Sequence, residues 1–147
     1  EVDEDDAIDC TNYFLDQDGD GFGVEDSRCM CAADGDYTAL NSTDCYDDPD
    51  NGDLVYPGTT LFYSTDRGDG SFDYNCNDEE EQKWGSDDVA GSCSESFGSC
   101  SAPEGWRDSP PSCGDVGTWR SGCDGFGLFG ILTCSWDDED PRTQECR

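Results

Sequence analysis

Alternate acids in the run Asp-Gln-Asp-Gly-Asp-Gly-Phe-Gly at residues 16–23 are the clearest chemical signal in this sequence. The three carboxylates are Asp16, Asp18 and Asp20. Gly19 and Gly21 allow the tight backbone curl that would aim all three at one point. Hard oxygen donors at this spacing suit Ca²⁺, which takes six to eight oxygens and often a backbone carbonyl. That carbonyl would belong to Phe22, two residues after the third acid.

The run does not complete a calcium site by itself. An EF-hand loop places a bidentate Glu at its twelfth position, which here is Ser27. The missing donors must come from elsewhere, and Asp44 and Asp48 in a second acidic cluster are the best candidates. The competing interpretation is a solvated turn that carries acids and binds nothing. Repulsion among closely spaced carboxylates favours a bound cation.

A second group of alternating oxygen donors lies further along the chain. Its members are Asp73, Asn75 and Asn77, followed by Asp78. They could hold a second ion or complete the first site, so we expect one or two calcium ions. A polar turn around a structural disulfide is the alternative.

Composition fits a metal-dependent fold. The 147 residues carry a formal charge of −30 and are only 33% hydrophobic, which by themselves indicate disorder. Eleven cysteines and 12% aromatic residues argue instead for a folded chain. We therefore expect a small, loop-rich, mainly irregular fold with short β-strands, stabilised by calcium and disulfides.

The cysteines indicate disulfides rather than zinc. The sequence has no histidine, and the closest cysteine pair, Cys29 and Cys31, lacks the spacing of a zinc knuckle. Five cysteines precede Gly85 and six follow it. The six can close three local bridges, whereas the five leave one thiol that is buried, free or bonded to another chain. This usage favours an oxidising compartment.

Composition shifts divide the chain into three parts: an acidic arm (1–9), a calcium-binding module (10–84) and a disulfide-rich β module (85–147). Pro57-Gly58 and residues 123–125 are turn signals, and 78–84 could form one or two helical turns. The expected strands are 13–15, 54–56, 59–64, 117–120 and 126–136.

Four elements in order resemble the MopE-type metal-binding repeat of secreted bacterial surface proteins, found in myxobacteria and related lineages. They are D-Q-D-G-D-G-F-G, D-C-Y-D-D, Y-P-G and F-D-Y-N-C-N-D, and they span about residues 12–84. The resemblance implies calcium binding and adds Asp47 to the ligand candidates. Tyr46 and Asn77-Asp78 depart from the usual repeat. The spacing is also similar to thrombospondin type 3 repeats, without their tandem periodicity.

These observations predict a secreted or cell-surface calcium-binding structural protein, either an adhesive or spacer module or a fibre subunit. Its first residue, Glu1, is consistent with removal of a secretion signal. Expected partners are other copies of the chain, as a homopolymer or disulfide-linked oligomer, or other surface components. Nucleic acid would be repelled, and the most apolar run, 126–132, is too short to span a membrane.

Two other functions remain open. A calcium-dependent carbohydrate- or protein-binding module would use the four tryptophans, which we expect instead to form the core. A glycosidase would need a distinct carboxylate pair, but nothing singles one out, so we expect no enzyme activity. Arg67-Gly68-Asp69 spells an adhesive tripeptide, which we attribute to chance, and Asn41 begins an N-glycosylation pattern.

Overall fold

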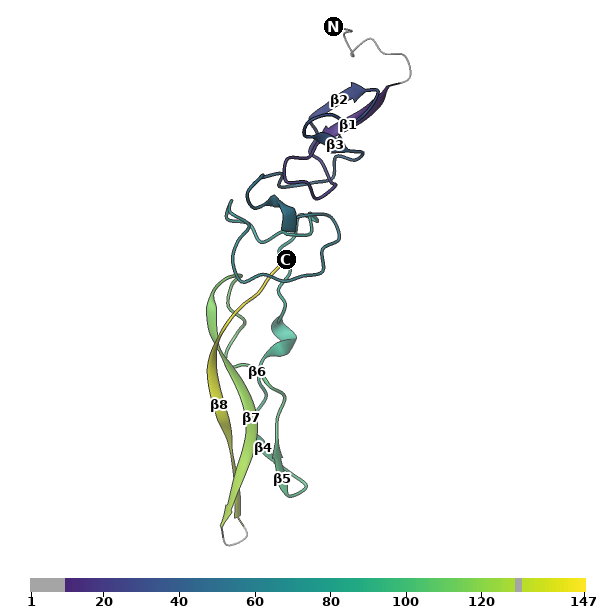
Figure 1. Cartoon of the computed structure of the whole chain (residues 1–147). Helices are drawn as coiled ribbons and strands as arrows, with labels where there is room; N and C mark the ends of the chain where they lie inside the picture. The colour runs from purple at the N-terminus through teal and green to yellow at the C-terminus, as the bar shows by residue number, and fades with distance from the viewer. Residues whose placement is uncertain (1–9, 129–130) are drawn as a thin grey trace. The chain divides into compact units, whose positions relative to one another are not determined.

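The computed structural model describes residues 10–128 and 131–147, which excludes the predicted acidic arm (Figure 1). The expected small, loop-rich fold with short β-strands and disulfides is confirmed: loops dominate, the strands form small antiparallel sheets, and the described residues contain only two short 3-10 helices in addition. The chain separates into two units. The first includes residues up to Leu61, Asp66–Glu81 and Arg147, and the second includes Phe62–Thr65 and Gln82–Cys146. In the described part of the chain, no helix has the length and hydropathy needed to cross a bilayer.

A three-stranded antiparallel sheet opens the first unit. Its central strand is β1 (Thr11–Leu15), flanked by β2 (Ser27–Met30) and β3 (Tyr37–Ala39). The expected strand at 13–15 is therefore confirmed. The buried apolar side chains of this unit are few: Met30, Tyr37, Ala39, Val55 and Tyr74.

The strands expected at 54–56 and 59–64 are wrong. A 3-10 helix, η2 (Gly52–Leu54), begins there instead, because the Asp48 carboxylate accepts the amides of Asp50 and Asn51 and curls the chain. The predicted turn at Pro57-Gly58 is present, with Gly58 at φ +90°. Within 59–64, only Tyr63 forms an isolated bridge, with Cys146.

A long hairpin dominates the second unit. Its strands are β7 (Val116–Leu128) and β8 (Ile131–Thr143), and β6 (Gly105–Trp106) extends the sheet beside β7. A small second hairpin pairs β4 (Ser94–Ser96) with β5 (Ser99–Ser101). The remaining element is the 3-10 turn η3 (Ser86–Asp88).

Two further expectations for this unit are wrong. The turn predicted at 123–125 is continuous strand, with Gly125 opposite Cys134. Glycine at this position lets the Cys100 side chain approach closely and does not bend the chain. A Cβ there would collide with the Cys100 sulfur. No helical turn forms at 78–84, since Gln82 forms an isolated bridge with Cys146 and Lys83 donates its amide to the Glu145 carbonyl at 2.9 Å.

Tryptophans form the core of the second unit. Trp106 and Trp119 are 1% and 8% exposed, with ring centroids 5.2 Å apart, and Trp84 packs against both. The Arg142 guanidinium lies over Trp119, 4.0 Å from its centroid. Three of the four tryptophans are therefore structural, as expected from the sequence.

Five disulfides supplement these small cores. All pair within the sequence groups expected, and Cα–Cα distances are 5.3–5.6 Å. Cys31 is left free and exposed. The pairs are Cys10–Cys29 and Cys45–Cys76 in the first group, and Cys93–Cys123, Cys100–Cys134 and Cys113–Cys146 in the second.

The tryptophan core yields a stability prediction. Trp106→Ala should lower the free energy of unfolding of the second unit by about 3–5 kcal/mol, because it removes a fully buried aromatic ring. Phe126→Ala is the control: its side chain is 72% exposed, and we expect a change within about 0.5 kcal/mol. Urea unfolding followed by tryptophan fluorescence measures both, and equal effects would contradict the assigned core.

Candidate metal centre

The Asp-Gly run forms the loop that leaves β1, and each acid uses one oxygen to shape it. Asp16 Oδ1 accepts the Gly19 amide at 2.8 Å, and Asp18 Oδ1 accepts the Asp20 amide at 3.0 Å. Gly19 and Gly21 take φ values of +80° and +93°, a region that other residues rarely adopt. The loop thus fixes the backbone with one oxygen of each acid and leaves the Oδ2 atoms of Asp18 and Asp20 without a donor.

A second acidic segment folds back onto this loop, as the sequence required. Asp47 Oδ1 accepts the amides of Gln17 at 2.5 Å and Asp18 at 3.2 Å. The Asp44 amide donates to the Gly23 carbonyl at 3.0 Å. Ligand oxygens of Asp16, Asp18 and Asp47 lie within 4.8 Å of one another. Residues about thirty positions apart therefore meet at one place.

Four buried carboxylate oxygens in this region have no hydrogen-bond donor. They are the Oδ2 atoms of Asp18, Asp20, Asp44 and Asp47. Asp16 differs, because Gly19 and the Thr38 hydroxyl donate to its two oxygens at 2.8 Å each. Buried acceptors without donors are costly, and several on neighbouring acids indicate a missing positive partner. We call Asp16, Asp18, Asp20, Asp44 and Asp47 the five-aspartate centre.

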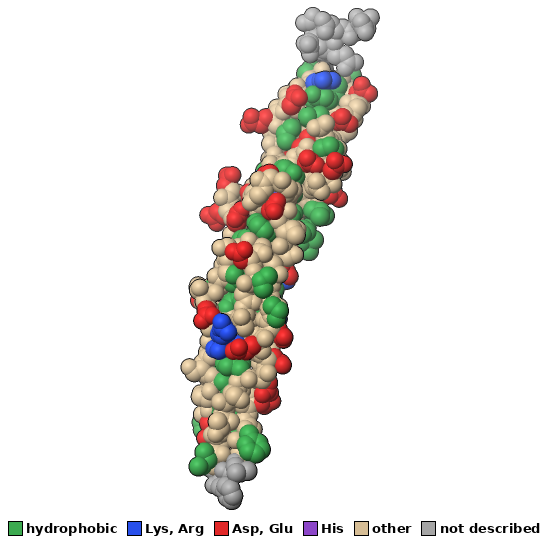
Figure 2. Space-filling model, turned by 90° about the vertical axis from the view of Figure 1, so that its left-hand side faces the viewer, with side chains coloured by type: hydrophobic (Ala, Val, Ile, Leu, Met, Phe, Trp, Pro, Cys, Tyr) green, Lys and Arg blue, Asp and Glu red, His purple; other side chains and the backbone are tan. Residues whose placement is uncertain are grey.

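Electrostatics support the same conclusion. Burial, reinforced by the neighbouring carboxylates, raises the pKa values of Asp18 and Asp20 from 3.8 to about 6. Burial and the charge of Asp47 also raise the pKa of Asp44. The visible face carries many acidic and few basic side chains (Figure 2). Among the described residues, no ion pair includes a member of the centre.

The other two candidates near the centre are placed differently. The Phe22 amide donates to Asp20 Oδ1 at 2.7 Å and its ring stacks on Tyr56, so its backbone borders the centre, and ligation by its carbonyl stays a prediction. Asp48 instead uses Oδ1 for the turn that precedes η2. The structure does not group it with the five aspartates.

Gly52 is a part of the site that the sequence reasoning missed. A Cβ at this position would collide with Asp18 Oδ2 and lie 2.7 Å from the Tyr46 carbonyl oxygen. The Tyr46 carbonyl oxygen and the unpartnered Asp18 Oδ2 therefore both lie close to Gly52. Backbone oxygens carry no residue-type signal, so nothing in the sequence could have identified this donor.

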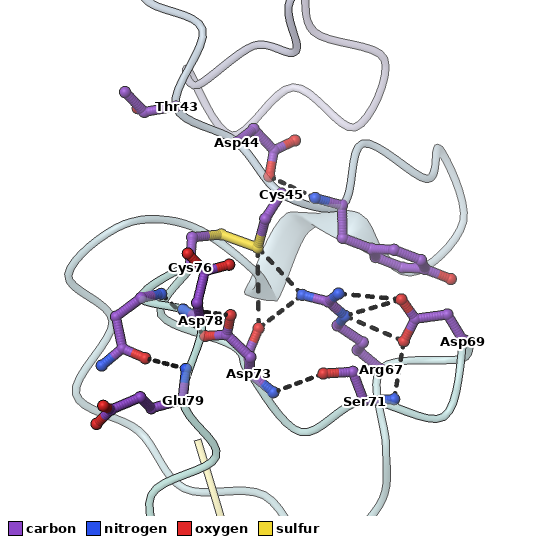
Figure 3. Close-up of a disulfide and its surroundings, with 12 residues drawn as sticks. Thr43, Asp44, Cys45, Arg67, Asp69, Ser71, Asp73, Cys76, Asp78 and Glu79 are labelled. Carbon is purple, nitrogen blue, oxygen red and sulfur yellow. Dashed lines mark hydrogen bonds and ion pairs between the residues drawn. A yellow bond between two sulfur atoms is a disulfide. The ribbon is translucent and has the colours of Figure 1, made fainter.

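In the second group of alternating donors, backbone amides occupy the side-chain oxygens of Asp73 and Asn77, whereas Asn75 Oδ1 is buried without a hydrogen-bond partner. Asp73 accepts the amides of Asn77 and Asp78 at 3.1 and 3.0 Å, one on each carboxylate oxygen (Figure 3). Asn77 Oδ1 accepts the Glu79 amide, and Asn75 donates to Glu81. These contacts close a polar turn beside a disulfide, which was the alternative interpretation.

A further group of candidate ligand atoms, from Asp44, Cys45 and Cys76, also lies within 4.8 Å. The two cysteines are bonded to each other, so they offer no thiolate to a metal. Only the Asp44 carboxylate remains. The geometry therefore favours a single centre.

Arg67 of the Arg-Gly-Asp tripeptide has a structural role. Its side chain is only 11% exposed, pairs with Asp69 at 3.0 Å and donates to the Asp73 carbonyl at 2.7 Å (Figure 3). The guanidinium thus joins two parts of the loop that holds the Cys45–Cys76 disulfide. An adhesive tripeptide would need this group to be accessible.

Comparison with family models, curated proteins and solved structures finds no match for this chain. The similarity to the MopE-type repeat therefore stays a sequence-based prediction. The five-aspartate centre is the feature of the structure that bears on function.

The position of Arg67 predicts a loss of stability on substitution. Arg67→Ala should lower the free energy of unfolding of the first unit by about 1.5–3 kcal/mol, because charged hydrogen bonds in a sheltered position are lost. Arg107→Ala is a matched control, since its ion pairs are exposed and should contribute at most about 1 kcal/mol. Denaturant titration measures the free energy of unfolding of both variants. Equal losses would contradict the structural role of Arg67.

The raised pKa values predict an unusual pH dependence for the metal-free protein. Because Asp18 and Asp20 bind protons more tightly when folded, stability should fall as pH rises from about 4 through about 6. Saturating calcium should reverse this trend, since the ion favours the ionised acids. Melting temperatures of metal-free and calcium-loaded protein across this range measure both.

A double variant, Asp18→Asn with Asp20→Asn, controls for the general acidity of the chain. Its metal-free pH profile should be flatter than that of the wild type. An identical profile would show that these two acids do not cause the effect.

Proposed function

We propose that this chain is a calcium-binding structural module of a secreted or cell-surface protein, and that one ion orders its first unit. The observation that carries the proposal is the set of four buried, unpartnered carboxylate oxygens contributed by two distant segments. A cation among them would satisfy these acceptors and offset the repulsion that raises the pKa values.

The donor set favours calcium over other common metals. All of the candidate donors are oxygens, and a carbonyl such as that of Tyr46 adds to five carboxylates. Calcium accepts six to eight oxygens in flexible geometry, whereas magnesium needs a compact octahedron and keeps several waters. Zinc prefers nitrogen and sulfur, which this centre lacks.

The role of the ion would be architectural. Hydrogen bonds from Gln17, Asp18 and Asp44 already bring the loop after β1 against residues 44–47. An ion held by both segments would lock them together, so that binding energy becomes folding energy. Such a cross-link suits a unit with few buried apolar side chains.

Extracellular location is supported by the disulfides. Five bridges link the described residues, and disulfides persist mainly in oxidising compartments. The MopE-type resemblance points to the same location and to a role at a bacterial surface, as a spacer, an adhesive module or a fibre subunit.

The alternative of a carbohydrate-binding module receives less support. Stacking on sugars needs exposed aromatic faces, but Trp84, Trp106 and Trp119 pack against one another, and cations cover Trp84 and Trp119. These rings are already engaged in the core.

The decisive variant is Asp18→Asn, which keeps the side-chain oxygen that shapes the loop and removes one charge. Saturating calcium should raise the melting temperature of the wild type by about 10 °C or more, and magnesium should act much less. Asp18→Asn should lose most of this gain. In metal-free buffer it should be at least as stable as the wild type, because a buried charge is gone.

Asp87→Asn provides the control, because Asp87 is exposed in η3 of the second unit. It should respond to calcium as the wild type does. The proposal would be lost if calcium left the melting temperature unchanged or if both variants responded alike.

A further inference from the structure

Three cysteines border the pairing of β1 with β2 in the first sheet. Cys29 lies in β2 and Cys31 follows that strand, while Cys10 immediately precedes β1. Cys29 and Cys31 are two residues apart, and only Cys29 lies within the strand, since a bend follows Met30. Cys10 is bonded to Cys29, and Cys31 is free and exposed.

The ladder of β1 and β2 ends at Thr11 and Met30, and Cys31 lies in a bend just after it. In the antiparallel ladder of β1 and β2, Asn12 pairs with Cys29 and Thr11 pairs with Met30. One more rung would pair Cys10 with Cys31. Directly opposed residues have Cα atoms about 4.5–5.5 Å apart, which is within the range that disulfides span.

The observed bond departs from this register. Cys29 is a diagonal neighbour of Cys10, and diagonal neighbours in a regular ladder lie about 7–8 Å apart. Here their Cα atoms are 5.3 Å apart and the ladder stops at Thr11. The ladder could therefore gain one further rung, with Cys10 opposite Cys31, only if Cys10 were released from Cys29.

We propose that Cys10, Cys29 and Cys31 form a thiol–disulfide exchange site, in which Cys29 and Cys31 alternate as the partner of Cys10. The Cys31 thiolate attacks the Cys10 sulfur, the Cys10–Cys31 bond forms, and the Cys10–Cys29 bond breaks. Its electron pair leaves on the Cys29 sulfur, which then takes a proton. One thiol is consumed and one is released, so the step needs no external oxidant or reductant.

The site would also react with disulfides from outside. Whichever of Cys29 and Cys31 is free can attack a small disulfide or that of a neighbouring chain, forming a mixed disulfide and releasing the other sulfur as a thiol. The ligand class is therefore a disulfide-bearing molecule. Because the free thiol can move between Cys29 and Cys31, alkylation of the native chain should label both positions.

The sequence supplies a direct test for the two isomers. Met30 is the single methionine of the chain and separates Cys29 from Cys31, while the other four disulfides lie entirely after it. Cyanogen bromide cleavage without reduction therefore releases residues 1–30 when Cys10 is bonded to Cys29. The fragments stay joined when Cys10 is bonded to Cys31.

The native protein is incubated at alkaline pH, blocked with N-ethylmaleimide, and cleaved in acid, where exchange stops. We expect some chains to give joined fragments with the blocking group on Cys29, and their fraction to fall when incubation is done in acid. Complete release of residues 1–30, with the blocking group only on Cys31, would overturn the proposal. So would joined fragments blocked at Cys10.

Cys29→Ser gives an independent readout. If Cys10 can bond to Cys31, the purified monomer should show no thiol towards Ellman's reagent after denaturation, against one in the wild type. Two thiols per chain would overturn the proposal. Cys31→Ser, which keeps the observed Cys10–Cys29 bond, is the control and should also show none.

Discussion

The structure of the first unit depends on carboxylates that are buried close to one another without a positively charged partner. One carboxylate oxygen each of Asp18, Asp20 and Asp44 accepts a backbone amide in a tight turn, and the other oxygen is buried away from water. Hydrogen bonds from the backbone to these acids determine the loop shape, so the repulsion cannot be relieved by simply turning the acids outward. The shape of the loop and the repulsion that a cation would offset therefore have the same cause.

The remainder of the molecule compensates for a shortage of apolar area. The first unit buries only a few apolar side chains. It is held by disulfides and by polar contacts such as those of Arg67. The second unit uses a tryptophan cluster and three disulfides to hold its hairpins. Such covalent and ionic cross-links are the usual substitute for a large core.

Sequence patterns identified what depends on residue type and short spacing. The alternation of Asp16, Asp18 and Asp20 indicated a convergent loop, and the absence of a closing Glu at Ser27 indicated that a second segment must approach. The sequence also named that segment. It could not determine that Asp48 would cap its own turn while Asp47 approached the loop, because neighbouring aspartates have the same local options.

The errors in the strand assignments have a related cause. Gly125 looked like a turn residue, but it is glycine because the Cys100 sulfur lies against it. Gly52 is likewise glycine because Asp18 needs the space. Both reasons depend on residues distant in sequence, as does the register of β1 and β2. Tertiary contacts of this kind leave no local pattern.

The most direct test of the central claim is a crystal structure of the calcium-loaded protein with an anomalous difference map. The account predicts one peak for the ion, in contact with the carboxylates of Asp18, Asp20, Asp44 and Asp47. It would be contradicted by a map without a peak at the five-aspartate centre, with these acids protonated or bonded to donors instead.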